Sequence, residues 1–160
     1  MRKILVFLLV SHAVSLSSSQ NIVISKQEMY LYVISTGNSA DTLFIAPIGL
    51  GVNMGNKQQV GDQRTPEGTF HIQSIERASH WTHDFNDGKG PRKGAYGDWF
   101  VRLKVPKFKG IGIHGTCFPE SIGTRCSEGC IRLRNEDLRN FVNYIEPGMM
   151  VIITEDTQSQ

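Results

Sequence analysis

The chain has 160 residues, of which 39% are hydrophobic, so it is about as long as one domain and can bury one core. Seventeen Lys and Arg residues stand against 15 Asp and Glu residues. This near balance gives no support for a nucleic-acid partner, which normally requires a basic stripe on the surface.

The first residues have the three parts of a secretory signal peptide. A basic start, Met1-Arg2-Lys3, precedes the apolar run Ile4–Val10 and a small, serine-rich stretch to Gln20. The apolar run is too short to span a bilayer, which needs roughly 20 residues. A buried first strand with a basic tail is the alternative. We predict a signal peptide at 1–20 and export to the periplasm or cell envelope, with no stable membrane insertion after cleavage.

Cleavage would leave a single domain at 21–155 and a flexible tail at 156–160. It removes Arg2 and Lys3, so 15 basic residues would remain against 15 acidic ones, close to neutrality. We expect a monomer, because nothing in the sequence indicates an assembly.

The first two thirds of the domain is a succession of short apolar segments. Asn21–Ile34 predicts two strands around a Ser-Lys-Gln-Glu turn, and Leu43–Gly51 predicts a strand that Pro47 places at a sheet edge or a bulge. The polar segment 78–97 is long enough to predict a functional loop, such as a lid. Further strand patterns follow the turn-rich stretch Gly61–Gly68, at 69–72, 99–105 and 110–114.

One segment has helical periodicity. Asn135 is a candidate N-cap, and an apolar stripe with spacings of three and four residues follows it, until Pro147-Gly148 ends the helix before a last strand at 149–154. Many short strands and one late helix predict a mainly β fold, a sandwich or barrel with the helix packed on it. The stripe comprises Leu138, Phe141, Val142 and Ile145.

The segment 111–133 concentrates the side chains of a thiol enzyme. Cys130 follows the turn Ser127-Glu128-Gly129, whose backbone N–H groups, with that of Cys130, could form an oxyanion hole. A free thiol titrates near pH 8.5 and needs a base, for which His114 at a strand end is the candidate. Arg132 lies two positions after Cys130, so both point to one side of an extended chain. There Arg132 could hold a carboxylate.

Two other interpretations of this segment stay open. His114, Cys117, Cys126 and Cys130 could be four ligands of a tetrahedral zinc ion that stabilises a non-catalytic wall-binding module, although export favours disulfides. The odd cysteine count suggests one disulfide and one free thiol, which would also suit a purely structural disulfide loop.

The same residues resemble the signature of the L,D-transpeptidase (YkuD-like) family. His114-Gly115 and Ser127-Glu128-Gly129-Cys130-Ile131-Arg132 are similar to the family's His-Gly strand end and its Ser-His-Gly-Cys motif. Thr65-Pro66-Glu67-Gly68-Thr69-Phe70 resembles the family's Thr-Pro turn, and Tyr96-Gly97 the stretch before its central strand. The resemblance covers nearly the whole domain.

The resemblance implies a β-sandwich of mixed sheets with one packed helix, and a function. Cys130 would be the nucleophile, His114 the base and the Gly115 carbonyl the group that orients the imidazole. Arg132, Ser127, Gly129 and Tyr96 would lie at the substrate, with no cofactor and no metal. The substrate would be a peptidoglycan peptide stem, cross-linked 3→3 or exchanged at its terminal D-amino acid. With water as acceptor, the enzyme would be an L,D-carboxypeptidase.

Two features depart from the family's motif. Glu128 stands where the family usually has histidine, and a carboxylate there should raise the pKa of the thiol unless it pairs with Arg125 or Arg132. Cys117 and Cys126 are additional. We hypothesise that they form a disulfide, which requires the loop to bring their Cα atoms within ~7 Å.

Overall fold

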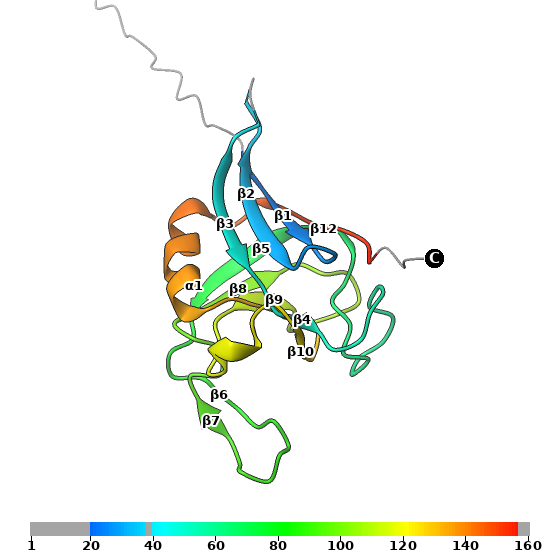
Figure 1. Ribbon diagram of the computed structural model, residues 1–160, viewed down its shortest axis with the longest axis vertical. Helices are drawn as coiled ribbons and strands as arrows, with labels where there is room; N and C mark the ends of the chain where they lie inside the picture. Colours follow the sequence, from blue (N-terminus) through cyan, green and yellow to red (C-terminus); the bar gives the residue numbers. More distant parts are fainter. Residues whose placement is uncertain (1–19, 38–39, 157–160) are drawn as a thin grey trace, which may run out of the picture.

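The structure is a computed structural model that describes residues 20–37 and 40–156. Its main element is a mixed, curled sheet of eight strands (Figure 1). In spatial order the strands are β11 (Ile131–Arg132), β9 (Gly112–His114), β8 (Trp99–Leu103), β5 (Gly68–Arg77), β12 (Met150–Ile153), β1 (Gln20–Ser25), β2 (Tyr30–Ser35) and β3 (Thr42–Pro47).

Two small sheets complete the β structure. β4 (Leu50–Gly51) pairs in parallel with β10 (Arg125–Ser127), and a hairpin of β6 (Thr82–His83) and β7 (Arg92–Lys93) projects from the body in Figure 1. The helical elements are short: 3-10 helix η1 (Pro119–Ser121), α1 (Asn135–Phe141) and 3-10 helix η2 (Val142–Tyr144). The mainly β fold with one packed helix in its C-terminal half is therefore confirmed.

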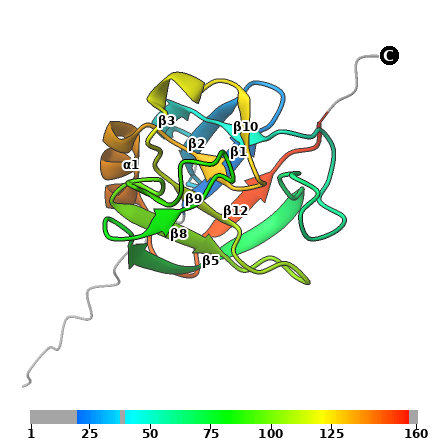
Figure 2. The same ribbon diagram turned by 90° about the horizontal axis from the view of Figure 1, so that it is seen from below.

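Alternating apolar residues of the strands form a single core against the helix. Ile22, Leu31, Val101 and Ile113 are fully buried. Helix α1 lies along one flank of the sheet in both views (Figures 1 and 2) and seals it, with the Phe141 ring 5.8 Å from that of Phe44 on β3. β3 is the last strand of the sheet, as Pro47 predicted.

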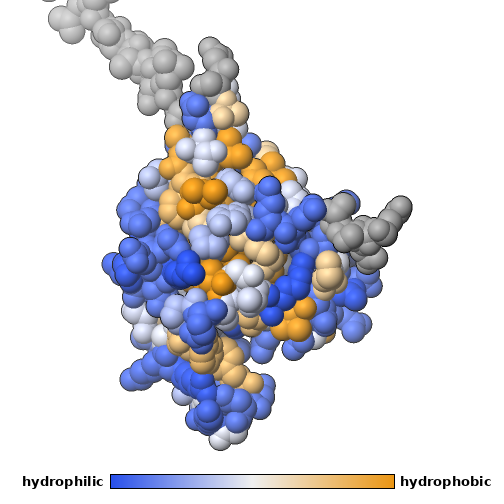
Figure 3. Space-filling model, viewed as in Figure 1, coloured by the Kyte–Doolittle hydropathy of each residue, from blue (hydrophilic) through white to orange (hydrophobic). Residues whose placement is uncertain are grey.

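Apolar side chains also reach the surface at this edge of the sheet. Figure 3 shows apolar residues over β3, where Leu43 and Ile45 are exposed. In the described part of the chain, no helix has the length and apolar character needed to cross a membrane.

The predicted helix is wrong in its cap and its length. Arg134, without a side-chain hydrogen bond, occupies the cap position, because the Asn135 side chain instead accepts the backbone N–H of Thr116 at 2.9 Å. The chain tightens into η2 after Phe141, and Ile145 is extended. A side chain used for a tertiary contact is not available to cap its own helix.

The end of the domain is held by a buried cluster of charges. The Nζ of Lys26, whose side chain is fully buried, lies 2.7 Å from Glu67 Oε1 and 2.8 Å from Asp156 Oδ2. Asp156 also pairs with Arg125 and accepts the Gly55 N–H at 2.7 Å. The cluster thus ties together β10 and the segments that follow β1, β4 and β12.

Both ends of the predicted domain organisation lie mostly outside the described residues. Of the predicted signal peptide, 1–19 lies outside them and Gln20 is the first residue of β1. Of the predicted flexible tail, 157–160 lies outside them. Asp156, which we placed in that tail, has a side chain only 2% exposed, because its charge is paired twice.

Candidate active site

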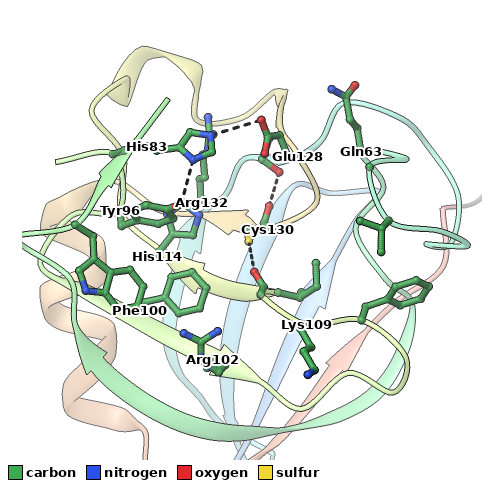
Figure 4. A pocket seen from close by; sticks show the side chains of 18 of the residues that line it. Gln63, His83, Tyr96, Phe100, Arg102, Lys109, His114, Glu128, Cys130 and Arg132 are labelled. Atoms are coloured by element: carbon green, nitrogen blue, oxygen red, sulfur yellow. Dashed lines mark hydrogen bonds and ion pairs between the residues drawn. The ribbon is translucent and has the colours of Figure 1, made fainter. Parts of the chain in front are cut away.

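Strand register brings the predicted site residues to one face of the sheet. On the parallel strands β11 and β9, Ile131 pairs with Ile113 and Arg132 with His114. Because neighbouring residues in register point to the same face and directions alternate along a strand, Cys130, Arg132 and His114 share a face. Figure 4 shows the three side chains around one pocket.

This pocket has a volume of about 570 Å³, enough for a short peptide segment. Aromatic side chains form one half of its wall, and segments from 57–63 and 108–111 form the other. Its ionised lining residues are mostly cationic, with one carboxylate, Glu128, against Lys57, Arg102, Lys109 and Arg132.

The imidazole of His114 is buried and oriented by the next residue. Its Nδ1 lies 2.7 Å from the carbonyl oxygen of Gly115. Since a carbonyl only accepts, Nδ1 carries the proton and Nε2 presents a lone pair. Burial lowers the pKa of His114 to about 3, the Gly115 carbonyl opposing this and the nearby Arg132 adding to it. The ring is therefore neutral at physiological pH.

Aromatic rings fix the plane of this imidazole. Phe100 on β8 is stacked on His114, with ring centroids 5.5 Å apart and an interplanar angle of 14°. Tyr96 covers it from another side at 4.9 Å. A Cβ on Gly112 would lie 2.5 Å from the Phe100 ring, so the glycine lets this ring lie flat on the strand.

A junction of two glycines and an amide holds the Gly115 carbonyl in place. Gly115 donates its N–H to the Tyr96 carbonyl at 2.7 Å. A Cβ on Gly115 would lie 2.9 Å from the Gly97 Cα and 2.1 Å from Asn135 Oδ1. The backbones can therefore meet only without side chains, as the Tyr96-Gly97 resemblance suggested.

Cys130 is a protonated thiol in this environment. Its Sγ donates to the Gly110 carbonyl oxygen at 3.3 Å. Burial is the largest effect and raises the pKa of the thiol; the Gly112 N–H and Arg132 oppose it, and Glu128 adds to it. A thiol with a raised pKa beside an imidazole with a lowered pKa is a neutral pair at rest.

The turn before Cys130 is closed by Ser127, which changes the expected oxyanion hole. The buried Ser127 hydroxyl donates to the Cys130 carbonyl oxygen and accepts the Gly129 N–H at 3.1 Å. Gly129 has φ +128°, which favours glycine. The Gly129 N–H is thus bonded to Ser127 in the structure, and its part in an oxyanion hole stays a prediction. The Cys130 N–H remains the candidate from this turn.

Arg132 is buried with hydrogen-bonding capacity to spare. It is 7% exposed, and its Nη1 donates to the Cys126 carbonyl oxygen at 2.9 Å. Within the described residues its Nε has no hydrogen-bond partner. A buried guanidinium with an unused donor beside the pocket suits a carboxylate or carbonyl group of a ligand.

Glu128 contacts neither arginine considered from the sequence. Arg125 pairs with Asp156, and Glu128, with a side chain 60% exposed, lies 3.5 Å from His83 Nε2. On the other side of that ring, His83 Nδ1 lies 3.1 Å from the Tyr96 hydroxyl (Figure 4). The predicted lid, residues 78–97, thus reaches the rim of the pocket through His83.

The other sequence interpretations fare less well. Cys117, Cys126 and Cys130 are free thiols, so the Cys117–Cys126 disulfide is not formed in the structure and stays a prediction for mass spectrometry. The Cys126 sulfur lies against the backbone of Gly49. The alternative in which His114 and the three cysteines bind zinc has no support, since no group of three or more His, Cys, Asp or Glu side chains in 20–37 and 40–156 could hold a metal ion.

Lys57, Arg102 and Phe100 are among the pocket residues that were not identified as site residues from the sequence. Lys57 lies in a polar loop that has neither helical nor strand periodicity. Arg102 lies on a strand, and the pattern of that strand does not distinguish it from an ordinary surface residue. Phe100 lies on β8, where every residue is buried or half-buried, so no contrast with exposed neighbours marks it. Nothing in the sequence showed that it lies on His114.

The pocket combines a thiol, a carbonyl-oriented imidazole and a buried guanidinium, the groups that thiol-dependent transferases and hydrolases use. The profile of the YkuD family, the L,D-transpeptidase catalytic domain, matches residues 19–153. The chain therefore belongs to this family, as its motifs indicated.

Individual relatives agree with this assignment. The chain is 30% identical over 142 residues to the probable L,D-transpeptidase YbiS of Escherichia coli, covering 82% of this chain and 44% of that protein. It is 31% identical over 99 residues to the putative L,D-transpeptidase YqjB of Bacillus subtilis, covering 61% of this chain and 56% of that protein. The chain spans about half the length of these relatives.

Solved structures share the fold. An L,D-transpeptidase from Mycobacterium smegmatis superposes with a TM-score of 0.63 at 20% identity, over 85% of this chain and 58% of that one. The helical cell shape determining protein Pgp2 from Campylobacter jejuni gives 0.63 at 23% identity, over 88% of this chain and 49% of that one.

Proposed function

We propose that this protein is an exported cysteine acyltransferase that acts on peptidoglycan peptide stems, with Cys130 as nucleophile and His114 as base. The observation that carries the proposal is the bond between His114 Nδ1 and the Gly115 carbonyl, which turns the unprotonated Nε2 toward the pocket that contains Cys130. Membership of the L,D-transpeptidase family supplies the substrate class.

In the first step, Cys130 Sγ attacks the carbonyl carbon of the third stem residue. The thiol proton passes to His114 Nε2 as the S–C bond forms, so that the neutral pair becomes charged only during reaction. The Cys130 N–H stabilises the oxyanion. The C–N bond to the terminal D-alanine then breaks, and Nε2 returns the proton to the departing amine.

In the second step an acceptor resolves the thioester. An acceptor amine attacks, gives its proton to Nε2, and forms an amide as the C–S bond breaks; the proton returns to sulfur. This gives a 3→3 cross-link or an exchanged terminal D-amino acid. Water in place of the amine would release the tripeptide, as an L,D-carboxypeptidase does. Arg132 positions the stem through its guanidinium, whose Nε–H has no partner among the described residues.

The test is product analysis by mass spectrometry after incubation with disaccharide-tetrapeptides. A dimer would indicate transpeptidation, and loss of alanine alone would indicate carboxypeptidase activity. Cys130→Ala should abolish both, and His114→Gln should lower turnover about 10²- to 10⁴-fold. Cys117→Ala is the matched control: it removes a free thiol that does not line the pocket, and it should keep activity. Turnover by Cys130→Ala would refute the proposal.

Export is tested separately. Fractionation of cells that produce the full chain should place the protein in the envelope, shortened by about 20 residues. Retention of residues 1–20 in the cytosolic fraction would contradict the predicted signal. Sedimentation of the purified protein tests whether it is a monomer.

A further inference from the structure

We propose that Lys57 forms a carboxylate-binding subsite beside Cys130 and thereby selects acidic substrates. This inference rests on the proposed function for the identity of the substrate, a peptide stem. The subsite itself rests on the position of one ammonium group.

Lys57 is a buried cation in the wall of the pocket. The residue is 8% exposed, and its Nζ would lie 3.6 Å from a Cβ placed on Gly129, the neighbour of the nucleophile. The ammonium lies over the Phe108 ring, 5.4 Å from its centroid. Lys57 therefore lines the same pocket as His114, Tyr96 and Cys130.

Asp62 holds this ammonium in place from behind. The Nζ of Lys57 lies 2.7 Å from Asp62 Oδ1. The carboxylate also accepts the backbone N–H groups of Gln58, Gln59 and Arg64 at 2.7, 3.0 and 3.1 Å. These three amides stabilise the carboxylate in addition to Lys57, and the short loop between the two residues pre-orients the ammonium. A fixed charge loses little conformational entropy on binding a ligand.

The ammonium has donors left for a ligand. An ammonium carries three N–H groups, and one of those of Lys57 is used by Asp62 among the described residues. A second carboxylate could accept these remaining N–H groups in charge-assisted hydrogen bonds. In Arg102, by contrast, two nitrogens already donate to Glu76, at 2.7 and 2.9 Å.

The ligand chemistry is therefore a carboxylate close to the carbonyl that Cys130 attacks. A tetrapeptide stem offers two sources, the C-terminal carboxylate of the leaving D-alanine and a side-chain carboxylate of the third residue. Both lie a few bonds from the scissile carbonyl. Lys57 would bind one of them while Arg132, on the His114 side, positions the rest of the stem.

The first experiment does not depend on peptidoglycan. Alkylation of Cys130 by iodoacetate, an anion, is compared with alkylation by neutral iodoacetamide, using peptide mapping. Because the thiolate fraction affects both reagents equally, the ratio of the two rates reports the local charge alone. Lys57→Met should lower this ratio at least about fivefold, the effect of one charge at roughly 4 Å with the full screening of water.

Two variants control the result. Lys57→Arg keeps the positive charge and should keep a high ratio. If Lys57→Met fails to fold by circular dichroism, Lys57→Gln takes its place and must lower the ratio to the same extent. Lys104→Met removes an exposed lysine outside the pocket lining and should leave the ratio unchanged. An unchanged ratio in folded Lys57→Met would overturn the subsite.

The second experiment uses tetrapeptide stems. Lys57→Met should raise KM about 10- to 100-fold, the usual loss for a hydrogen bond to a charged group, with a smaller change in kcat. Amidation of the C-terminal or of the side-chain carboxylate should reproduce that rise in the wild type, and the amide that does so identifies the group bound. If neither amide raises KM, the subsite is refuted. If no stem is turned over while the alkylation ratio still depends on Lys57, the subsite stands and the proposed function fails.

Discussion

Gly115→Ala should damage both the stability and the catalysis of this protein. The new Cβ would lie 2.1 Å from Asn135 Oδ1 and 2.9 Å from the Gly97 Cα, both closer than real Cβ contacts. The Asn135 amide must move away, and it then releases the N–H of Thr116, which is 2% exposed. Overpacking of this kind costs about 1–3 kcal/mol, and a buried, unpaired N–H about 1–3 kcal/mol more.

Catalysis should suffer through the carbonyl of the same residue. That oxygen orients His114 through a contact of 2.7 Å, and a displacement of about 1 Å would reduce kcat on the order of 100-fold. Urea unfolding measures the loss in free energy of unfolding, and tetrapeptide turnover measures the loss in kcat. A change below about 0.5 kcal/mol with kcat within threefold of wild type would refute the described junction.

A double-mutant cycle with Asn135→Ala separates the two contacts. In the Asn135→Ala background the 2.1 Å conflict no longer exists, and the 2.9 Å approach to the Gly97 Cα remains. Gly115→Ala should then cost less than in the wild type, with a coupling energy of about 1 kcal/mol or more between the two positions. Equal costs in both backgrounds would mean that Asn135 does not limit the space at Gly115.

Three further predictions follow from the charged groups. Asp156→Asn should destabilise the domain by about 1.5–3 kcal/mol in urea unfolding, since it removes one of the two carboxylates that pair with the buried Lys26 ammonium, whereas Glu155→Gln at an exposed neighbouring position should change stability little. Alkylation of Cys130 by iodoacetamide should increase with pH up to and above the ordinary thiol range, because burial raises the pKa of the thiol. The rate of this alkylation should show no inflection near pH 6.5, because the pKa of His114 is about 3 and its ring stays neutral throughout. A rate that is constant from pH 5 to 8 would instead indicate a preformed thiolate–imidazolium pair. Glu128→Gln should speed this alkylation at pH 7, because its carboxylate raises the pKa of the thiol, and a slower reaction would mean that the carboxylate acts on the thiol in the opposite sense.

Much of the fold follows from local patterns in the sequence. Alternation places the strands, Pro47 marks β3 as the sheet edge, and the apolar stripe places α1. The predictions are wrong where a side chain with a local structural preference instead makes a tertiary contact. Asn135 is a residue type that often caps helices, but its side-chain oxygen accepts the backbone N–H of Thr116, 19 residues away. A cap prediction considers neighbouring residues alone, so it cannot foresee a hydrogen bond from a distant part of the chain.

Some residues of the candidate site could likewise be predicted from the sequence, and others could not. His114 and Cys130 could be proposed because each is part of a short motif, and β9 and β11 bring the two motifs together. Gly129 shows the limit of this reasoning. From the sequence alone its backbone N–H could be assigned to an oxyanion hole. In the structure this N–H donates to the Ser127 hydroxyl, and that contact depends on the positive φ angle of Gly129. Lys57 could not be found, since its place beside Gly129 depends on how two loops pack.

The charge cluster around Lys26 has a practical meaning for protein engineering. The family match ends at residue 153, so a catalytic domain excised at that boundary would lack Asp156. Asp156 binds Gly55, two residues before the lysine that we assign to the substrate. A truncated enzyme or one with a reporter fused directly after Ile153 would therefore carry a loosened pocket wall, and its weak activity could be mistaken for an intrinsic property. Fusions should begin after residue 156.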